Sequence, residues 1–474
     1  MLKLFFWGGD HCDIKERKVE IKEVLLFWIF IFTIWLIMLL ASYPGIYGYD
    51  CIYQLKWYIS GNINLHHPII HTVLMGFCIE KIGNVFGSKE LGFFAYCIIQ
   101  MIVLSAAMTY VYVFMKNNKI KKWIRLVYLL MCAFVPTNAI MSFSGTKDIL
   151  FSAFFLFSVV KLVYIIQQPL IVKNKRFLVG FVFSVALNIL FRNQAVFVWG
   201  LVFIIGILIL KNIRKMWILV FFIIFILYTG VNAFLNNKFN AYRLDSHIQE
   251  YLSVPCLQLG KALYYNYDVL SIQDKDEILR FVPESANNHR SAIADSYKGS
   301  FNYTLFSEDP IAFFKLYVRV GFKTPYTYFD SWGRLTIGLW YTDMNYRDEE
   351  AYHPYWEYNM TQIDDDRFVL LNRKVPQYLK SLNSFLEKMT YDNNYQKIPI
   401  ISLLFSGAFY VWIVLWFIAW CIINNKYNYL LAASLPFLYW LTLFLGPVVL
   451  YRYLYPIIIS TPVFICIMFV EKKE

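Results

Sequence analysis

Long apolar runs are the feature that most constrains the fold of this chain of 474 residues. Several of them approach about 20 residues, the length that a helix needs to cross a hydrocarbon core of about 30 Å. Hydrophobic residues make up 59% of the chain and charged residues 16%, which is more apolar than a water-soluble domain of this size requires. The runs do not alternate between apolar and polar residues, so helices are expected rather than β-barrel strands. We therefore predict an all-α polytopic membrane protein.

Ten apolar runs are candidates for transmembrane helices. They lie at residues 24–40, 91–115, 123–135, 149–166, 177–191, 195–210, 217–235, 398–423, 429–445 and 448–470. The first run follows basic residues, but its length and the many later runs favour a retained span over a signal peptide.

The ten runs divide the chain into three predicted modules. Residues 1–235 form a membrane module with about seven spans, residues 236–397 are polar, and residues 398–474 contain the last three spans. A connection as long as 236–397 is unusual for a simple loop. We therefore expect it to fold as a mainly helical domain outside the membrane, inserted before the last three spans.

The positions of Lys and Arg predict the orientation of the spans. The N-terminus, alternate short loops, Lys161 and the C-terminal tail carry 20 of the 44 basic residues but only 7 of the 32 acidic residues. Because basic residues favour the cytoplasmic side, we expect both termini in the cytoplasm and residues 236–397 outside. This excess nearly equals the whole net charge of +12, so the basic composition reflects topology and gives no support for nucleic-acid binding.

The first outer loop carries a carboxylate close to the expected membrane surface. Asp50 stands about ten residues beyond the first run, where a carboxylate can stay ionised while partly shielded, as a general base requires. The alternative is that Asp50 caps a helix beginning at Cys51. His66, His67 and His71 follow in the same loop. No HExxH frame or third carboxylate ligand accompanies them, so polar contacts to a substrate, or packing, are favoured over a zinc site.

Four further charged residues lie on the same expected side. Lys147 and Asp148 directly precede the fourth run, Arg192 lies between the fifth and sixth, and Arg452 opens the last. Lys147 suits a phosphate, while Asp148 suits a sugar hydroxyl, a metal, a partnership with Asp50, or simply the N-terminus of a helix. A charge at the membrane border usually has a partner, although snorkelling to lipid headgroups is the alternative for either arginine. Guanidinium groups converging with two carboxylates favour a specific phosphate site.

With these residues in this order, the chain resembles the GT-C superfamily of polytopic membrane glycosyltransferases, especially its bacterial members. The resemblance rests on short motifs at Asp50, His67-Pro68, Lys147-Asp148, Arg192-Asn193, Arg452-Tyr453 and Tyr455-Pro456. It extends into the polar segment at Val254-Pro255-Cys256-Leu257-Gln258 and Gly338-Leu339-Trp340-Tyr341, and so covers nearly the whole chain.

The resemblance implies an enzyme of the bacterial cytoplasmic membrane. Such an enzyme transfers a sugar, with inversion, from a polyprenyl-phosphate carrier to an envelope glycan, lipid or protein acceptor outside the cell. The expected partners are therefore the lipid-linked donor, this acceptor and the bilayer, with no nucleic acid.

The resemblance also assigns roles to individual residues. Catalysis falls to Asp50, as the base that deprotonates the acceptor hydroxyl, and to Asp148, which orients donor or acceptor. The substrate-binding positions, which would hold the lipid phosphate or the sugar, are His67, Lys147, Arg192 and Arg452. Family members often pair two acidic residues in the first loop, whereas this chain offers one. No cofactor is therefore implied with certainty, and a divalent metal is left open.

Other functions compete with this hypothesis. A polymerase or ligase that uses a lipid-linked oligosaccharide would perform closely related chemistry. A flippase or transporter for lipid-linked glycans would also need arginines and a lipid groove, but transporters tend to show matching halves with broken helices and charges near the midplane. The sequence shows neither feature. A non-enzymatic scaffold or receptor would leave the one-sided set of charged residues unexplained.

Overall fold

The computed structural model describes residues 20–286, 293–343, 371, 373–391 and 398–470. Within these ranges the regular structure is helical, without β-strands, and two isolated bridges join Ile46 to Ser144 and Asn64 to Tyr242. The predicted all-α fold is confirmed.

Among the described residues, five helical segments are long and apolar enough to cross a membrane. They are α2 (Ile21–Ala41), α6 (Lys89–Asn117), α9 (Lys147–Gln167), α12 (Arg214–Lys238) with the short turn before it, and α23 (Tyr451–Val470). A sixth arises if α7 (Lys122–Phe134) and α8 (Pro136–Ser142), which are bent by 54°, form one broken span. Pro136 lacks a backbone N–H and restricts the residue before it, which accounts for the break. The chain is thus a multi-pass membrane protein.

The remaining predicted runs also form helices, but shorter ones. They are α10 (Lys175–Phe191), α11 (Ala195–Ile209), α21 (Gly407–Ile423), which follows the single turn α20 (Ile401–Leu404), and α22 (Leu430–Leu443). Every apolar run identified in the sequence therefore coincides with a helix, whereas the total of ten spans stays a prediction.

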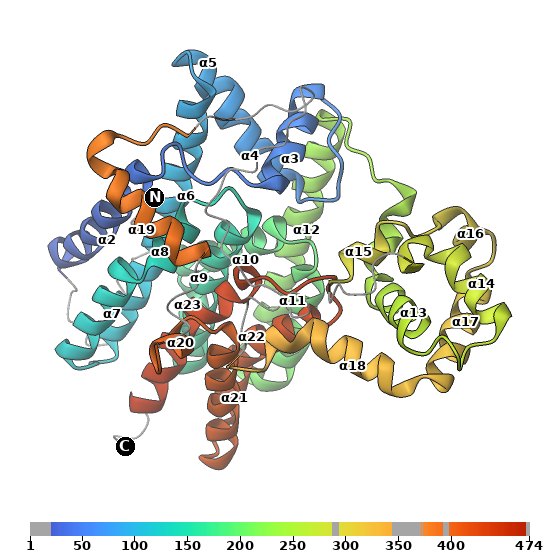
Figure 1. Cartoon of the computed structure of the whole chain (residues 1–474). Helices are drawn as coiled ribbons and strands as arrows, with labels where there is room; N and C mark the ends of the chain where they lie inside the picture. The colour runs from blue at the N-terminus through green and yellow to red at the C-terminus, as the bar shows by residue number, and fades with distance from the viewer. Residues whose placement is uncertain (1–19, 287–292, 344–370, 372, 392–397, 471–474) are drawn as a thin grey trace.

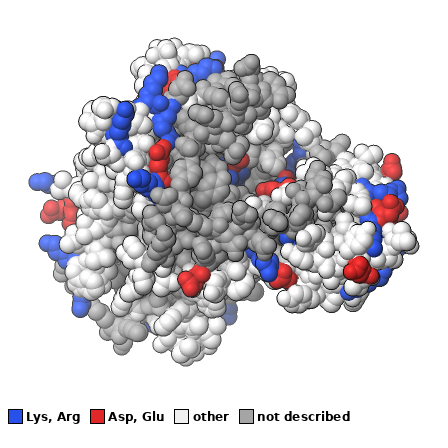
Figure 2. All heavy atoms as spheres, in the orientation of Figure 1, with Lys and Arg blue, Asp and Glu red and all other residues white. Residues whose placement is uncertain are grey.

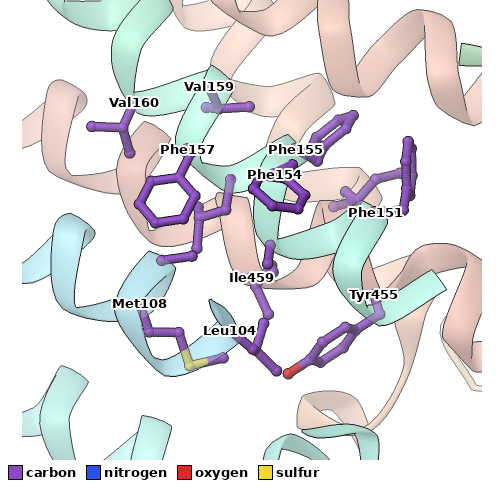
Figure 3. Close-up of a cluster of buried hydrophobic side chains, with 14 of the residues drawn as sticks. Leu104, Met108, Phe151, Phe154, Phe155, Phe157, Val159, Val160, Tyr455 and Ile459 are labelled. Carbon is purple, nitrogen blue, oxygen red and sulfur yellow. The ribbon is translucent and has the colours of Figure 1, made fainter. Parts of the chain in front are cut away.

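Helix α9 lies at the centre of the bundle, in contact with α6, α10 and α23 (Figure 1). In the apolar stretch of α9, 89% is buried inside the protein, whereas in the apolar stretch of α12 the buried share is 11%. Helix α9 is therefore central and α12 is peripheral. A helix that is apolar on all sides is expected in such a buried position. Figure 3 shows phenylalanine side chains of α9 in one buried cluster with Leu104 and Met108 of α6 and with Tyr455 and Ile459 of α23.

The loop after α2, which is the predicted first outer loop, folds as a helical hairpin of α3 (Tyr49–Ser60) and α4 (Ile69–Phe77). Gly61 ends α3 with φ of 72°, a left-handed conformation that glycine adopts without strain. Gly76 of α4 lies against the ring of Tyr58, so close that a Cβ atom there would be 2.2 Å from the ring. A π-helical turn at Cys78–Ile82 and the short α5 (Gly83–Val85) then lead to α6.

Residues 253–336 form a lobe with a hydrophobic core separate from that of the bundle. Its helices are α13 (Ser253–Tyr265), α14 (Ile272–Phe281), α15 (Asp295–Lys298), α16 (Tyr303–Glu308), α17 (Pro310–Lys323) and α18 (Pro325–Thr336). Figure 1 shows the lobe beside the bundle, with α18 leading back to it, and Figure 2 shows charged side chains of both signs on the lobe.

The polar segment also contributes to the bundle itself. Helix α19 (Lys380–Tyr391) packs against α2, and Leu371 and Leu386 belong to the bundle core. The backbone N–H of Lys374 donates to the carbonyl of Tyr43 in the first outer loop at 3.1 Å. Leu371 and residues 373–391 therefore cover the membrane module, whereas the lobe has a core of its own and contacts the bundle at its edge, where the Ala294 N–H donates to the carbonyl of Pro447 at 2.9 Å.

Candidate functional site

A short backbone pairing brings two helix N-termini together. Ile46 donates to the carbonyl of Phe143 at 3.0 Å, and Gly145 donates to the carbonyl of Ile46 at 2.8 Å. Because α3 and α9 begin directly after these segments, Asp50 and Asp148 both lie in first helical turns near this pairing. The sequence separates the two carboxylates by almost one hundred residues, and the pairing brings their helices to one edge of the bundle.

Asp50 is in the first turn of α3 but does not cap it. The helix begins at Tyr49, its N-cap residue is Gly48, and no side chain caps the first turn, so the alternative of a capping aspartate is wrong. The Asp50 Oδ2 atom instead accepts a hydrogen bond from Arg452 Nη2 at 3.1 Å, and Oδ1 lies 3.9 Å from His67 Nε2. The Asp50 side chain keeps 28% of its surface exposed, so a substrate can reach it.

Asp148 is completely buried and joins the two arginines. Its Oδ1 accepts from Arg192 Nη1, and its Oδ2 accepts from Thr146 Oγ1 at 3.0 Å and lies 3.4 Å from Arg452 Nε. Thr146 also caps α9 by accepting from the Asp148 backbone N–H. Asp148 therefore lies at a helix N-terminus, as one alternative predicts. It also forms ion pairs with both Arg192 and Arg452.

Arg192 is held inside the protein. It follows the last residue of α10, and its guanidinium lies over the rings of Phe151, Tyr439 and Tyr453 at 5.5, 5.3 and 4.8 Å. Cation–π contacts and the ion pair with Asp148 fix this orientation. Within the described part of the chain, its Nε–H has no hydrogen-bond partner. Since Arg192 is buried, it does not snorkel outward to lipid headgroups in this structure.

His67 links Lys147 to Asp50. Lys147 Nζ donates to His67 Nδ1 at 2.8 Å, so the proton of the neutral ring is on Nε2, which faces Asp50. Burial and the charge of Lys147 hold the pKa of His67 well below its usual range. Burial raises the pKa of Asp50, but the positive groups around it, Arg452 foremost, outweigh burial and hold that pKa well below its ordinary value.

The structure thus brings all six predicted site residues into one continuous network. Its order in space is Lys147, His67, Asp50, Arg452, Asp148 and Arg192. A cleft opens onto the middle of this network, where Asp50 and Arg452 share its wall with Ser144, Thr146 and the apolar Ile46, Met141 and Leu450. Asp148 and Arg192 do not line the cleft but lie buried behind Arg452.

A second polar network supports the turn before α9 and is not evident from the sequence. His71 contacts Gln54 Oε1 at 3.1 Å and the Tyr96 hydroxyl at 2.7 Å, and that hydroxyl also lies 2.7 Å from Gln100 Oε1. Gln100 Nε2 in turn donates to the carbonyls of Ser142 and Ser144 at 3.0 and 2.7 Å. The available signal was a glutamine inside an apolar run, which usually has a partner.

The three histidines of the first loop do not converge on one point. His67 belongs to the network of Asp50, whereas His71 contacts Gln54 and Tyr96. The ring of His66 meets that of His67 edge to face at 4.7 Å. In the ranges that the structure describes, no group of three or more His, Cys, Asp or Glu side chains could hold a metal ion.

The fold and the site define an all-α, multi-pass membrane protein with a charged cleft between the loop that carries Asp50 and the last helix. The chain belongs to DUF6020, a family of unknown function, whose sequence model matches residues 61–474. This match includes five of the six network residues and begins after Asp50. No curated protein and no solved structure matches the chain.

Proposed function

We propose that this protein is a membrane glycosyltransferase that moves a sugar from a polyprenyl-phosphate carrier to an acceptor of the cell envelope. The observation that carries the proposal is the pairing of Asp50 with Arg452 at the wall of the cleft, at 3.1 Å. A carboxylate can accept a proton, and a guanidinium can bind phosphate oxygens with two parallel hydrogen bonds. Sugar transfer from a lipid phosphate needs these two groups side by side.

Donor binding would convert Asp50 into a stronger base. A phosphate entering the cleft competes with Asp50 for Arg452, since its oxygens match the guanidinium fork. Once Arg452 turns to the phosphate, the charge that lowers the pKa of Asp50 is neutralised and this pKa rises. The base is thus held inactive without a donor, which predicts that the donor binds before the acceptor reacts.

The transfer step then proceeds by direct displacement. The acceptor oxygen forms a bond to the anomeric carbon while the bond from that carbon to the phosphate oxygen breaks. The acceptor proton passes to Asp50, and the phosphate retains the electron pair of the broken bond. Attack opposite the leaving group inverts the anomeric centre. Arg452 neutralises the charge that develops on the phosphate, as fixed donors do in other transfer reactions.

The buried members of the network position these two groups. Asp148 holds Arg192 and Arg452 together, and we assign it to positioning because it is fully buried and absent from the cleft wall. Lys147 fixes the tautomer of His67, whose Nε2–H faces Asp50. Positive charge from Lys147 and Arg192 adds to the field that favours an anionic donor.

The proposed setting is a bacterial cytoplasmic membrane crossed by ten spans. Both termini lie in the cytoplasm, and the cleft and the lobe of residues 253–336 face outward. The basic residues of the predicted inner segments support this orientation. A lipid-linked donor cannot leave the bilayer, so a cleft near its outer border suits such a substrate.

The test compares Asp50→Asn with Glu80→Gln, which removes a carboxylate of the same loop that pairs with Lys89 at 2.7 Å. Lipids from a strain lacking the protein should contain an accumulated lipid-linked sugar, which then serves as the donor in proteoliposomes. We expect Asp50→Asn to lower transfer by about 10²–10⁴-fold, the usual contribution of a general base, and to leave the yield of inserted protein unchanged. Glu80→Gln should remain active. Undiminished turnover by Asp50→Asn would remove Asp50 as the base.

A further inference from the structure

Helix α17 is apolar on both of its faces. Phe313, Leu316 and Val320 point into the core of the lobe, as expected for a helix of a small domain. The opposite face carries Ile311, Phe314, Val318 and Phe322, spaced three or four residues apart, and all four are exposed. Exposed apolar surface of this extent usually marks a contact with a partner or a membrane.

Helix α18, the next helix in the chain, also exposes aromatic side chains. Tyr326 and Phe329 lie on one side of that helix, and with Phe322 they are the most exposed aromatic side chains of the two helices, at 79%, 74% and 85%. We call Ile311, Phe314, Val318, Phe322, Tyr326 and Phe329 the aromatic stripe. The buried residues Tyr328, Ser331 and Leu335 occupy the other side of α18. Two consecutive helices therefore each leave apolar side chains uncovered.

Two of the three basic residues of α17, Arg319 and Lys323, are held away from this stripe. Arg319 pairs with Asp274 and Glu277 of α14 at 2.7 Å each, and Lys323 pairs with Asp274 at 2.5 Å. These ion pairs hold the basic side chains on the α14 side of the helix. The stripe itself is apolar and aromatic, with the exposed Lys315 at its edge on α17 and the ion pair of Asp330 with Arg334 beside it on α18. Aromatic side chains bordered by charged ones suit the boundary between lipid headgroups and acyl chains.

Three tryptophan indoles join the end of α18 to the bundle helices α21 and α22. Trp332 donates to the carbonyl of Phe444 at 3.2 Å and Trp440 to that of Leu339 at 3.0 Å. Trp412 donates to the carbonyl of Trp340 at 2.7 Å. The Trp412 ring is itself exposed on α21, one of the apolar helices of the bundle. Helix α18, which carries Tyr326 and Phe329, is thus continuous with the turn η6 (Ile337–Leu339), which contacts the bundle helices α21 and α22 (Figure 1).

From this continuity we propose that the aromatic stripe binds the bilayer surface and that the lobe is a membrane-interface module. Phe322, Tyr326 and Phe329 insert at the level of the headgroups, beside the tryptophans at the ends of α21 and α22. Aromatic side chains are enriched at this depth because their rings are apolar and their polar edges reach water. The proposal concerns the lobe alone and does not depend on the chemistry proposed for the cleft.

The test uses the full-length protein in nanodiscs that each hold one copy. The described cysteines are all buried, and Cys12 is replaced by Ser, so a fluorophore can be attached at Phe322→Cys. Asp276→Cys, exposed on α14, is the matched lobe control, and Phe225→Cys on the exposed face of α12 is the positive control. Doxyl-labelled lipids should quench the labels at 322 and 225 and leave the label at 276 unchanged.

Two outcomes would overturn the proposal. The first is a label at 322 that remains as bright as the label at 276 while the label at 225 is quenched. The second is a change in the fluorescence of the label at 322 that occurs only in vesicles with many copies of the protein. That result would mean that the stripe binds a second copy of the chain and not the bilayer. As a further check, Tyr326→Ser with Phe329→Ser should reduce the quenching at 322, because less apolar surface remains to hold the stripe in the bilayer.

Discussion

At the scale of single residues, the site depends on an arginine shared by two carboxylates with different surroundings. Arg452 contacts Asp50, which is partly exposed, and Asp148, which is fully buried. An exposed ion pair contributes little to stability, whereas breaking a buried pair leaves an uncompensated charge in a poor solvent. The two aspartates should therefore differ in the effect of replacement, even though both contact the same guanidinium.

This difference yields a prediction about stability. Asp148→Asn should destabilise the protein by about 3–5 kcal/mol, because Arg192 and Arg452 lose their buried counter-charge. Asp50→Asn should lower the midpoint of thermal unfolding in detergent less than Asp148→Asn does, because Asp50 is partly exposed and Arg452 keeps Asp148 as a counter-charge. Equal midpoints for the two variants would contradict the assignment of Asp148 to positioning and Asp50 to catalysis.

At the scale of structural elements, the geometry of the cleft depends on how closely the first outer loop approaches the turn before α9. A Cβ atom on Gly145 would lie 2.6 Å from Cys51 Sγ and 2.9 Å from the ring of Phe93. Cys51 directly follows Asp50, and Gly145 precedes Lys147 and Asp148 by two and three residues. A larger side chain at Gly145 should therefore change the geometry of the site, although every charged residue of the site is retained.

Replacing Gly145 by Ala tests this dependence. We expect transfer to fall in Gly145→Ala while the protein still inserts and folds, because the helix N-termini that carry Asp50 and Asp148 are forced apart. Adding Cys51→Ala removes the nearer of the two obstructing groups and should restore part of the activity. The assay is the proteoliposome transfer reaction, with Cys51→Ala alone as the control. A double variant no more active than Gly145→Ala would show that the Cys51 contact is not the cause.

The buried network of α4 and α6 predicts a dependence of stability on pH. Burial, aided by the charge of Lys147, lowers the pKa of His71 to about 3, so the folded protein keeps this histidine neutral. An unfolded histidine titrates near 6.5, so below that pH the unfolded state binds a proton that the folded state does not. His71 should therefore remove about 1.4 kcal/mol of stability per pH unit as the pH falls from 6.5 towards 3.

Thermal unfolding of the wild type and of His71→Gln at pH 7 and pH 5 measures this contribution. Glutamine can still bond to Gln54 and Tyr96 but does not titrate. The wild type should therefore lose more stability on acidification than the variant. Identical losses would show that His71 is protonated equally in both states.

Much of the fold and of the site could be predicted from the sequence, for a definite physical reason. Charged residues such as Asp50, Arg192 and Arg452 are conspicuous at the borders of apolar runs, since few charges occur there without partners. Burial of Asp148 could not be predicted, because a position relative to the end of a run does not fix the rotation of the helix. Tyr439 and Tyr453 were missed because aromatic residues make up 20% of the chain and most of them only pack.

The division of the polar segment into a lobe and a part that packs against the bundle could not be predicted from the sequence either. Apolar spacing at residues 375–389 indicates a helix, and α19 forms there, but the spacing does not reveal which core the helix joins. In the structure Leu386 packs into the bundle, while α17 forms part of the core of the lobe. The core that a helix joins depends on the surfaces against which it packs. These surfaces cannot be inferred from the local periodicity of the sequence.

At the scale of the whole molecule, function requires the loop of Asp50 and the start of α23 to lie outside, opposite the basic loops. Three variants, each with one added exposed cysteine and with Cys12 replaced by Ser, test this in intact cells with a maleimide that cannot cross the inner membrane. Ser60→Cys at the end of α3 and Asp276→Cys in the lobe should react, because both are exposed and belong to the predicted outer segments. Asn424→Cys, between α21 and α22 beside Lys426, should react only after the membrane is opened.

This experiment examines the orientation separately from the chemistry. Reaction of Asn424→Cys in intact cells would place the loop of Lys426 outside and contradict the charge-based topology. Reaction of Ser60→Cys only in opened membranes would place Asp50 in the cytoplasm. There the cleft would face the wrong compartment for an extracytoplasmic acceptor, even though its charged network were intact. Labelling of Ser60→Cys and Asp276→Cys alone would put the cleft and the lobe on one side, as sugar transfer to the envelope requires.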